Sequence, residues 1–101
     1  MLKATYTSLA LTDIRAVSVY LAEESPDSAR RFQLALRDTI GWLKQFPEMG
    51  SKYPHPESEN LRVKLVTGFS NYVVFYKASG EELTVIRVLH GSRDMPEVKF
   101  E

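Results

Sequence analysis

The feature that constrains this chain most is a pair of helical periodicities separated only by Ser25-Pro26-Asp27. In residues 8–24, and again from residue 26 to about residue 45, apolar side chains recur every three or four positions, which predicts two amphipathic helices. The residues expected on the buried faces are Leu9, Ile14, Val17, Tyr20 and Leu21 in the first segment and Ala29, Phe32, Leu36, Ile40 and Leu43 in the second. The break is too short for anything but a tight reversal, so we expect an antiparallel helical hairpin.

The residues of the break also have the chemistry of a helix start. Ser25 is a good N-terminal cap, and Pro26 suits the first helical position because no amide donor is needed there. Asp27 places negative charge at the positive end of the helix dipole. At the far end, Pro47 cannot continue a helix and Gly50 permits a sharp turn, so the second helix is expected to stop before Pro47.

Strand-like segments lie on both sides of the hairpin. They are residues 3–7, 61–66, 72–77 and 83–89. Turns are expected at 67–71 and 78–82, and residues 51–60, with a histidine between two prolines, are expected to form an exposed loop. The last strand is apolar on both faces, which predicts a central place in the sheet. A polar tail should follow it from residue 92.

This order predicts an α+β fold of β-α-α-β-β-β topology, with the N-terminal helical hairpin packed on a small, mainly antiparallel sheet. Residues 1–101 are the size of a single domain. Cysteine is absent and no apolar run is long enough for a signal peptide or a membrane span, so we expect a cytoplasmic protein that enters no membrane. Lys and Arg number 13, as do Asp and Glu, and this balance disfavours direct sequence-specific binding of nucleic acid.

The two histidines are candidates for catalysis. His55 lies between prolines in the expected loop, which favours an ordinary solvated side chain. His90 ends the last strand, where it fits a general acid or base and equally fits a donor to a backbone carbonyl. Spacing alone places no serine or acid beside it. Two histidines without cysteine match no metal-ligand pattern, and the scattered glycines form no phosphate loop, so neither a metal nor a cofactor is expected.

Four basic residues are expected at the strands or just beyond them. They are Arg62, Lys64, Arg87 and Arg93. If they converge on one side of the sheet, they can grip a phosphate or an acidic partner. The alternative is a solvated strand face with ordinary surface charge, and the sequence leaves both open.

Some apolar residues of the hairpin do not all fit its buried stripes. They are Leu9, Leu11, Val19 and Leu34. Apolar residues left over on a helical hairpin can form a groove for a partner's amphipathic helix, or they can pack under loops or lie exposed.

Taken in order, several short motifs resemble one family. They are residues 10–14 with Tyr20, 25–32, 46–50, 71–76 and 85–94, which cover nearly the whole chain. The chain is similar to the RelE/ParE superfamily of type II toxin–antitoxin toxins, and most similar to ParE within it. The resemblance implies a small toxin of the same topology that is neutralised by a cognate ParD-like antitoxin in a hetero-oligomer. ParE toxins poison DNA gyrase, whereas RelE-type relatives cleave mRNA in the ribosomal A site.

The residues that the nuclease branch uses are only partly present. Arg62 and Lys64 match its basic residues on the first strand after the hairpin, and Arg93 matches the arginine after the last strand. The arginine that should follow the tyrosine of the next strand is missing, because Val73 follows Tyr72. The tyrosine of the tail is also missing, with Lys99 and Phe100 in its region. RNA cleavage needs groups that activate the 2′-hydroxyl and stabilise charge on the phosphate, so this set favours a toxin without catalytic residues.

The resemblance therefore predicts two partners. The antitoxin is expected to contact Leu9, Leu11, Leu34, Arg62, Arg87 and Arg93. DNA gyrase is expected to meet the exit of the last strand, at Arg93, Asp94 and Met95. Two alternatives stay open: a ribosome-dependent endoribonuclease that uses Arg62, Lys64, His90 and Arg93, and a degenerate member that binds antitoxin without toxicity.

Overall fold

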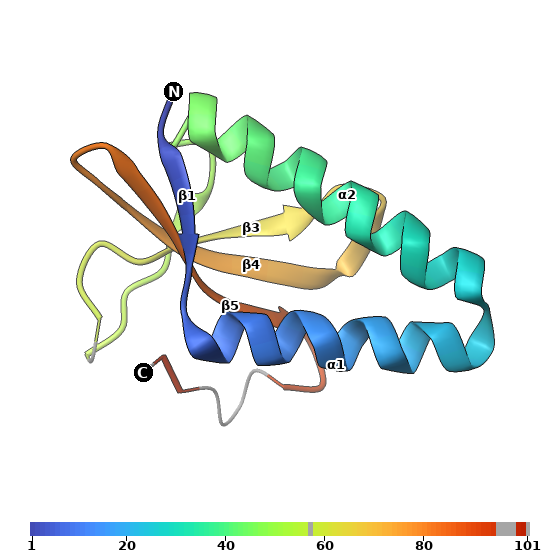
Figure 1. The fold of residues 1–101 in the computed structure, drawn as a ribbon. Helices are drawn as coiled ribbons and strands as arrows, with labels where there is room; N and C mark the ends of the chain where they lie inside the picture. The colour runs from blue at the N-terminus through green and yellow to red at the C-terminus, as the bar shows by residue number, and fades with distance from the viewer. Residues whose placement is uncertain (57, 95–98, 101) are drawn as a thin grey trace.

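A computed structural model describes residues 1–56, 58–94 and 99–100 and contains two helices and a five-stranded sheet. The elements are β1 (Lys3–Tyr6), α1 (Ser8–Glu24), α2 (Pro26–Gln45), β2 (Ser51–Lys52), β3 (Arg62–Val66), β4 (Phe69–Ser79) and β5 (Glu82–His90) (Figure 1). The strands lie in the order β1-β5-β4-β3-β2, with β1 parallel to β5 and the other pairs antiparallel. The predicted α+β class and the central place of the last strand are confirmed. No helix of the described residues is long and apolar enough to cross a bilayer.

One serine joins the two helices without a loop. The Ser25 N–H donates to the Leu21 carbonyl at 2.9 Å and ends α1, while the Ser25 side chain accepts from the Ser28 N–H at 3.4 Å and begins α2. Pro26 is the first residue of α2, as predicted. The first helix has its own cap in Thr7, whose hydroxyl accepts from the Ala10 N–H at 3.0 Å, so β1 ends one residue earlier than expected. The tight hairpin is confirmed (Figure 1).

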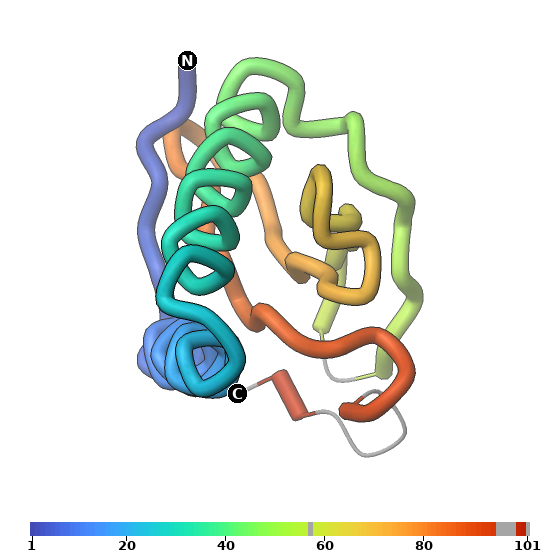
Figure 2. Tube along the Cα trace, turned by 90° about the vertical axis from the view of Figure 1, so that its right-hand side faces the viewer, coloured from blue at the N-terminus to red at the C-terminus, as the bar shows by residue number. Residues whose placement is uncertain are grey.

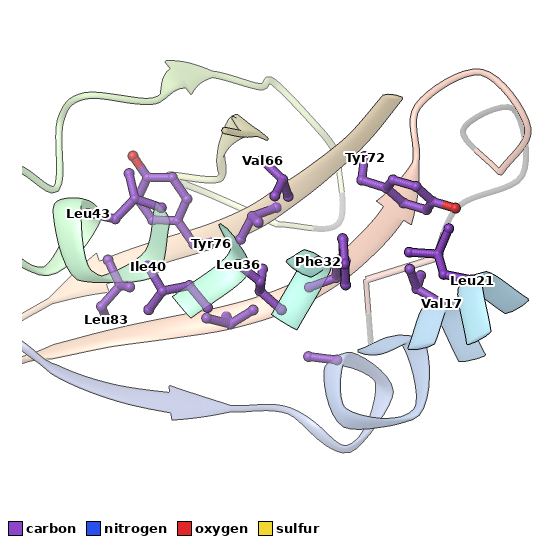
Figure 3. Close-up of a cluster of buried hydrophobic side chains, with 14 of the residues drawn as sticks. Val17, Leu21, Phe32, Leu36, Ile40, Leu43, Val66, Tyr72, Tyr76 and Leu83 are labelled. Atoms are coloured by element: carbon purple, nitrogen blue, oxygen red, sulfur yellow. The ribbon is translucent and has the colours of Figure 1, made fainter. Parts of the chain in front are cut away.

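The main core lies between the hairpin and one face of the sheet. All five residues predicted for the buried stripe of α2 are buried there, together with residues of β4 and β5 (Figure 3). On α1 the buried residues are Ala10, Val17 and Leu21. The prediction for Tyr20 is wrong, because its side chain is 44 % exposed and lies beneath the guanidinium of Arg93 rather than in the core.

The other face of the sheet is covered as well. The second cluster consists of Leu61, Val73, Phe75, Ile86, Leu89 and Phe100, with Tyr53 and Val63 packed against it. Residues 51–60 are thus more than the predicted exposed loop: Ser51–Lys52 form β2, and Tyr53 packs on Phe75 with ring centroids 5.0 Å apart. Figure 2 shows this segment, in light green, on the side of the molecule away from the helices. Phe100, expected in a polar tail, is buried against the same ring.

The connection between β3 and β4 is shorter than predicted. Only Thr67 and Gly68 form the turn, and Phe69 already belongs to β4. Gly68 has φ +84°, a backbone conformation that favours glycine. The Thr67 N–H donates to the hydroxyl of the buried Thr39 at 3.1 Å, and this hydroxyl donates to the Ala35 carbonyl at 2.9 Å. A polar residue of α2 therefore holds the turn, which no local pattern indicates.

Candidate functional site

A largely shielded ion pair occupies the edge of β5 where β1 stops. Arg87 Nε donates to Asp13 Oδ2 at 2.7 Å, Arg87 Nη2 donates to Oδ1 at 2.9 Å, and the side chains are only 15 % and 11 % exposed. The Val88 N–H donates to the same carboxylate at 3.1 Å, so Asp13 replaces the missing strand as an acceptor. The hydrogen bonds to Asp13 raise the pKa of Arg87 above its usual value. Arg87 also donates to the backbone carbonyl of Lys99.

A bulge in β5 explains how Arg87 reaches α1. Phe75 pairs with Arg87 but Tyr76 pairs with Val85, so Ile86 is an extra residue on β5. The inward-facing residues on the helix side are consequently three positions apart, at Val85 and Val88, instead of two. The bulge thus turns Arg87 out of the regular alternation, and three of its five N–H groups are used within the molecule.

Arg62 also has partners within the molecule. Its Nη1 donates to the carbonyl of Gly50 at 2.7 Å and to that of Glu48 at 3.3 Å. The hydroxyl of the fully buried Tyr76 reaches the same turn, donating to the Pro47 carbonyl at 2.7 Å and accepting from the Gly50 N–H at 2.9 Å. Burial raises the pKa of Tyr76 above its usual value. The two side chains together fix the turn after α2, a role that sequence reasoning missed for Tyr76.

The exit of β5 is a compact turn built around His90. The His90 Nδ1 accepts from the N–H groups of Ser92 at 3.3 Å and Arg93 at 3.1 Å. The His90 N–H donates to Asp94 Oδ2 at 3.0 Å, and the His90 ring packs edge-on against Tyr72 with centroids 5.2 Å apart. His90 thus accepts from backbone amides rather than donating to a carbonyl, and an Nδ1 used in this way is engaged as an acceptor.

Arg93 is more accessible than Asp94, the other charged residue of this turn. Its guanidinium lies over the ring of Tyr20, 5.0 Å from the centroid, and its Nε is 3.7 Å from Asp94 Oδ1. The side chain remains 49 % exposed. Arg93 and Asp94 therefore present charge of both signs beside the C-terminal half of α1. Met95, the third residue predicted for this surface, lies outside the described residues.

The predicted basic residues do not meet at one point. Arg62 holds the turn after α2, Arg87 is paired near the start of α1, and Arg93 lies near the end of α1. Lys64 lines an apolar hollow of about 420 Å³ on the face of the sheet that is turned away from the helices. The remaining lining residues are Met49, Ser51, Tyr53, Val63, Leu65, Val73 and Gly91. Val73, which stands where the nuclease branch has an arginine, thus faces Leu65 across the strands in apolar surroundings.

The apolar residues predicted on the hairpin surface are largely accessible. Leu11 is 57 % exposed, Leu34 is 42 % exposed and Val19 is 56 % exposed, whereas Leu9 is half-buried. A hydrogen bond of 3.1 Å from Gln33 to Ser18 joins the two helices on their outer side. Within residues 1–56, 58–94 and 99–100, no group of three His, Cys, Asp or Glu side chains is placed to hold a metal ion.

The geometry describes a small protein with accessible apolar side chains on a helical hairpin and charges at the exit of its sheet, a class suited to binding other proteins. A solved structure titled "Chromosomal ParDE TA system from P. aeruginosa" has the same fold, with a TM-score of 0.70 and 19 % identity over 89 % of this chain and 96 % of that one. The protein named Toxin RelE2 from Caulobacter vibrioides is 28 % identical over 93 residues, or 92 % of this chain and 99 % of that protein. Residues 4–95 match the family described as ParE toxin of type II toxin–antitoxin system, parDE. The chain belongs to the ParE toxin family, and the resemblance inferred from its motifs is confirmed.

Proposed function

We propose that this ParE-family toxin inhibits DNA gyrase by protein–protein binding in the cytoplasm and is neutralised by a cognate ParD-like antitoxin. The observation that carries the proposal is the apolar pairing of Val73 with Leu65, where a nuclease of the related branch needs a cation. A phosphate in the transition state of RNA cleavage would find Lys64 but no second cation in the lining of this hollow. A toxin that acts by binding alone needs neither group.

The engagement of His90 supports the same choice. A general base must have a free lone pair within reach of the proton that it removes. The Nδ1 of His90 is already used by two backbone amides, and its ring is held against Tyr72. The alternative endoribonuclease would therefore have to use Nε2 of His90 beside Arg93, because Arg62 is committed to the turn after α2 and Lys64 lines a separate hollow.

The proposed antitoxin surface is the outer side of the hairpin and the neighbouring exit of β5. Leu11 and Leu34 supply apolar area there, with Leu9 partly accessible beside them. Arg93 is the accessible cation for an acidic residue of the antitoxin. Arg62 and Arg87 contribute through their remaining N–H groups, and Arg62 also through the turn that it holds. The gyrase-directed surface is proposed at Arg93 and Asp94, with Met95 as the next residue of the chain.

The test is a supercoiling assay with purified gyrase, run beside a translation assay with the same toxin preparation. We expect gyrase inhibition with intact mRNA, and restoration of supercoiling when the antitoxin is added. Cleavage of mRNA in the ribosomal A site would replace the proposal with the endoribonuclease. Silence in both assays, with antitoxin binding retained, would identify a degenerate member without toxicity.

The decisive variant introduces the missing cation. Val73→Arg places a guanidinium in the hollow beside Lys64, and Val73→Leu, which keeps the hollow apolar, is its matched control. If the toxin acts by binding, neither variant gains RNA cleavage. A Val73→Arg protein that cleaves mRNA while the Leu variant does not would show that the remaining nuclease groups are functional.

A further inference from the structure

An exposed aromatic pair near the C-terminal end of α2 has no role in the surfaces described so far. Trp42 and Phe46, one helical turn apart, stack with ring centroids 5.9 Å apart and an interplanar angle of 23°. Trp42 is 55 % exposed and Phe46 is 51 % exposed. The N-terminus lies beside them, since the Leu2 N–H donates to the Lys44 carbonyl at 3.1 Å, and Met1 is 84 % exposed (Figure 1). We call Met1, Trp42 and Phe46 the aromatic ridge.

The ridge has a hollow on each side. One hollow, of about 300 Å³, is lined by Met1, Arg37, Asp38, Gly41, Trp42 and Gln45. The other, of about 470 Å³, is lined by Met1, Leu2, Lys44, Gln45, Phe46 and Pro47. A ridge beside hollows allows self-complementary packing, because a twofold axis brings the same patch of both copies together and can set each ridge into a hollow of the other.

Gly41 gives independent support for a close contact at this place. Glycine in the middle of a helix is destabilising relative to alanine. A Cβ added at Gly41 would meet nothing within 4 Å, so the packing of this chain does not require the glycine. A backbone or ring that approaches the helix from outside, beside Trp42, would require it.

We infer that the aromatic ridge binds a second copy of this chain. Two properties favour a copy over another partner, and the apolar area indicates how strong the contact is. The formal net charge is zero, so two copies do not repel each other, and the rim carries both signs at Arg37, Asp38 and Lys44. The half-exposed aromatic rings offer roughly 100 Å² of apolar area each, and Met1 adds a similar amount. That area, with its polar rim, fits a weak and reversible dimer rather than an obligate one.

Trp42 is the only tryptophan of the chain, so its fluorescence reports on the ridge directly. We expect the sedimentation coefficient of the purified toxin to rise from monomer to dimer as concentration increases through the micromolar range, with a blue shift of Trp42 emission over the same range. Trp42→Ala and Phe46→Ala should stay monomeric at every concentration. Val19→Ala removes a side chain of matched exposure, 56 %, from α1 and should dimerise like the parent.

Gly41→Gln separates loss of the interface from loss of the fold. A Cβ at this position meets nothing within 4 Å, so the thermal midpoint of the monomer should rise, while the bulk of the longer side chain in the hollow beside Trp42 should abolish the dimer. The inference is overturned if the parent toxin is monomeric throughout, or if a dimer persists in both the Trp42 and the Gly41 variants. A blue shift that appears only when antitoxin or gyrase is added to a monomeric toxin also overturns it, in favour of that protein as the occupant.

Discussion

Asp13 and Arg87, which lie 74 positions apart, form a two-point ion pair that joins α1 to the last strand. Because Asp13 also accepts the Val88 N–H and Arg87 also donates to Lys99, the pair holds three segments together. Both charges are mostly shielded from water, so each one depends on the other for compensation.

Breaking the pair from either side should destabilise the protein strongly. Asp13→Ala and Arg87→Ala should each lower the free energy of unfolding by about 3 kcal/mol, because each leaves a buried charge without its counter-charge. The double variant should lose much less than the sum of the two, as measured by urea denaturation in a double-mutant cycle. Additive losses would show that the two charges are not coupled in solution.

Removal of the Tyr76 hydroxyl should lower the free energy of unfolding. Tyr76→Phe leaves the ring in the core but removes a donor to Pro47 and an acceptor for Gly50. Buried backbone groups left without partners cost about 1–3 kcal/mol in the free energy of unfolding. Tyr72→Phe tests a buried ring elsewhere on the same strand and should cost less. Equal losses in the two variants would contradict the role of the Tyr76 hydroxyl in holding the turn.

Two glycines should respond to alanine in opposite directions. A Cβ at Gly50 would lie 2.5 Å from the Tyr76 hydroxyl oxygen and 2.9 Å from the Val63 carbonyl oxygen, so Gly50→Ala should cost about 1–3 kcal/mol by overpacking. Gly41→Ala meets no neighbour and should stabilise the helix by about 0.5–1 kcal/mol. Thermal unfolding of both variants measures the difference. The expectation fails if Gly50→Ala is neutral.

The start of α2 should lose stability in acid. Hydrogen bonds from Arg30 and then Arg31 lower the pKa of Asp27 below its ordinary value of 3.8. A carboxylate with a lowered pKa in the folded protein stabilises it above the ordinary value, and this contribution is lost as the pH falls through the folded pKa. Asp27→Asn should therefore lower the unfolding midpoint near neutral pH and have no effect in strong acid. If the unfolding midpoints of the parent and of Asp27→Asn differ by the same amount at every pH, this role of Asp27 is contradicted. Asp38→Asn, in the middle of the same helix, is the control.

Reversal of charge at Arg93 should weaken antitoxin binding. If Arg93 faces an acidic residue of the antitoxin, Arg93→Glu should raise the dissociation constant about tenfold or more and change its dependence on salt. Isothermal calorimetry at two salt concentrations measures both effects. Lys3→Glu makes the same change of charge at an exposed position of β1 and should bind normally. Unchanged affinity for Arg93→Glu would remove this residue from the interface.

The helical part of the fold could be predicted well because its signals are local. The buried stripe of α2 depends on residues three or four positions apart, and the cap at Ser25 depends on its immediate neighbours. The prediction for Tyr20 was wrong because its ring lies against the guanidinium of Arg93 instead of in the core. Arg93 is distant in the sequence, so helical periodicity could not indicate this contact. Phe100 was misplaced for a related reason, since its apolar partners are assembled only when the sheet forms.

The candidate site could be predicted less well. The spacing of the basic residues indicated a shared face, but a single extra residue at Ile86 changes the direction of Arg87. Periodicity cannot reveal a bulge, because both residues beside it are compatible with a strand. The partners of Arg62 are backbone carbonyls, which every sequence has, so nothing in the sequence marked them.

The parallel pairing of β1 with β5 determines when the sheet can be completed during synthesis. Residues 3–6 leave the ribosome well before residues 82–85, which are their neighbours in the sheet. Until those residues are made, β1 has no neighbour in the sheet, and the core under the hairpin lacks Leu83 and Val85. A chain that still lacks residues 82–85 therefore cannot complete the sheet, and the surfaces that depend on β5 form only after those residues have been made.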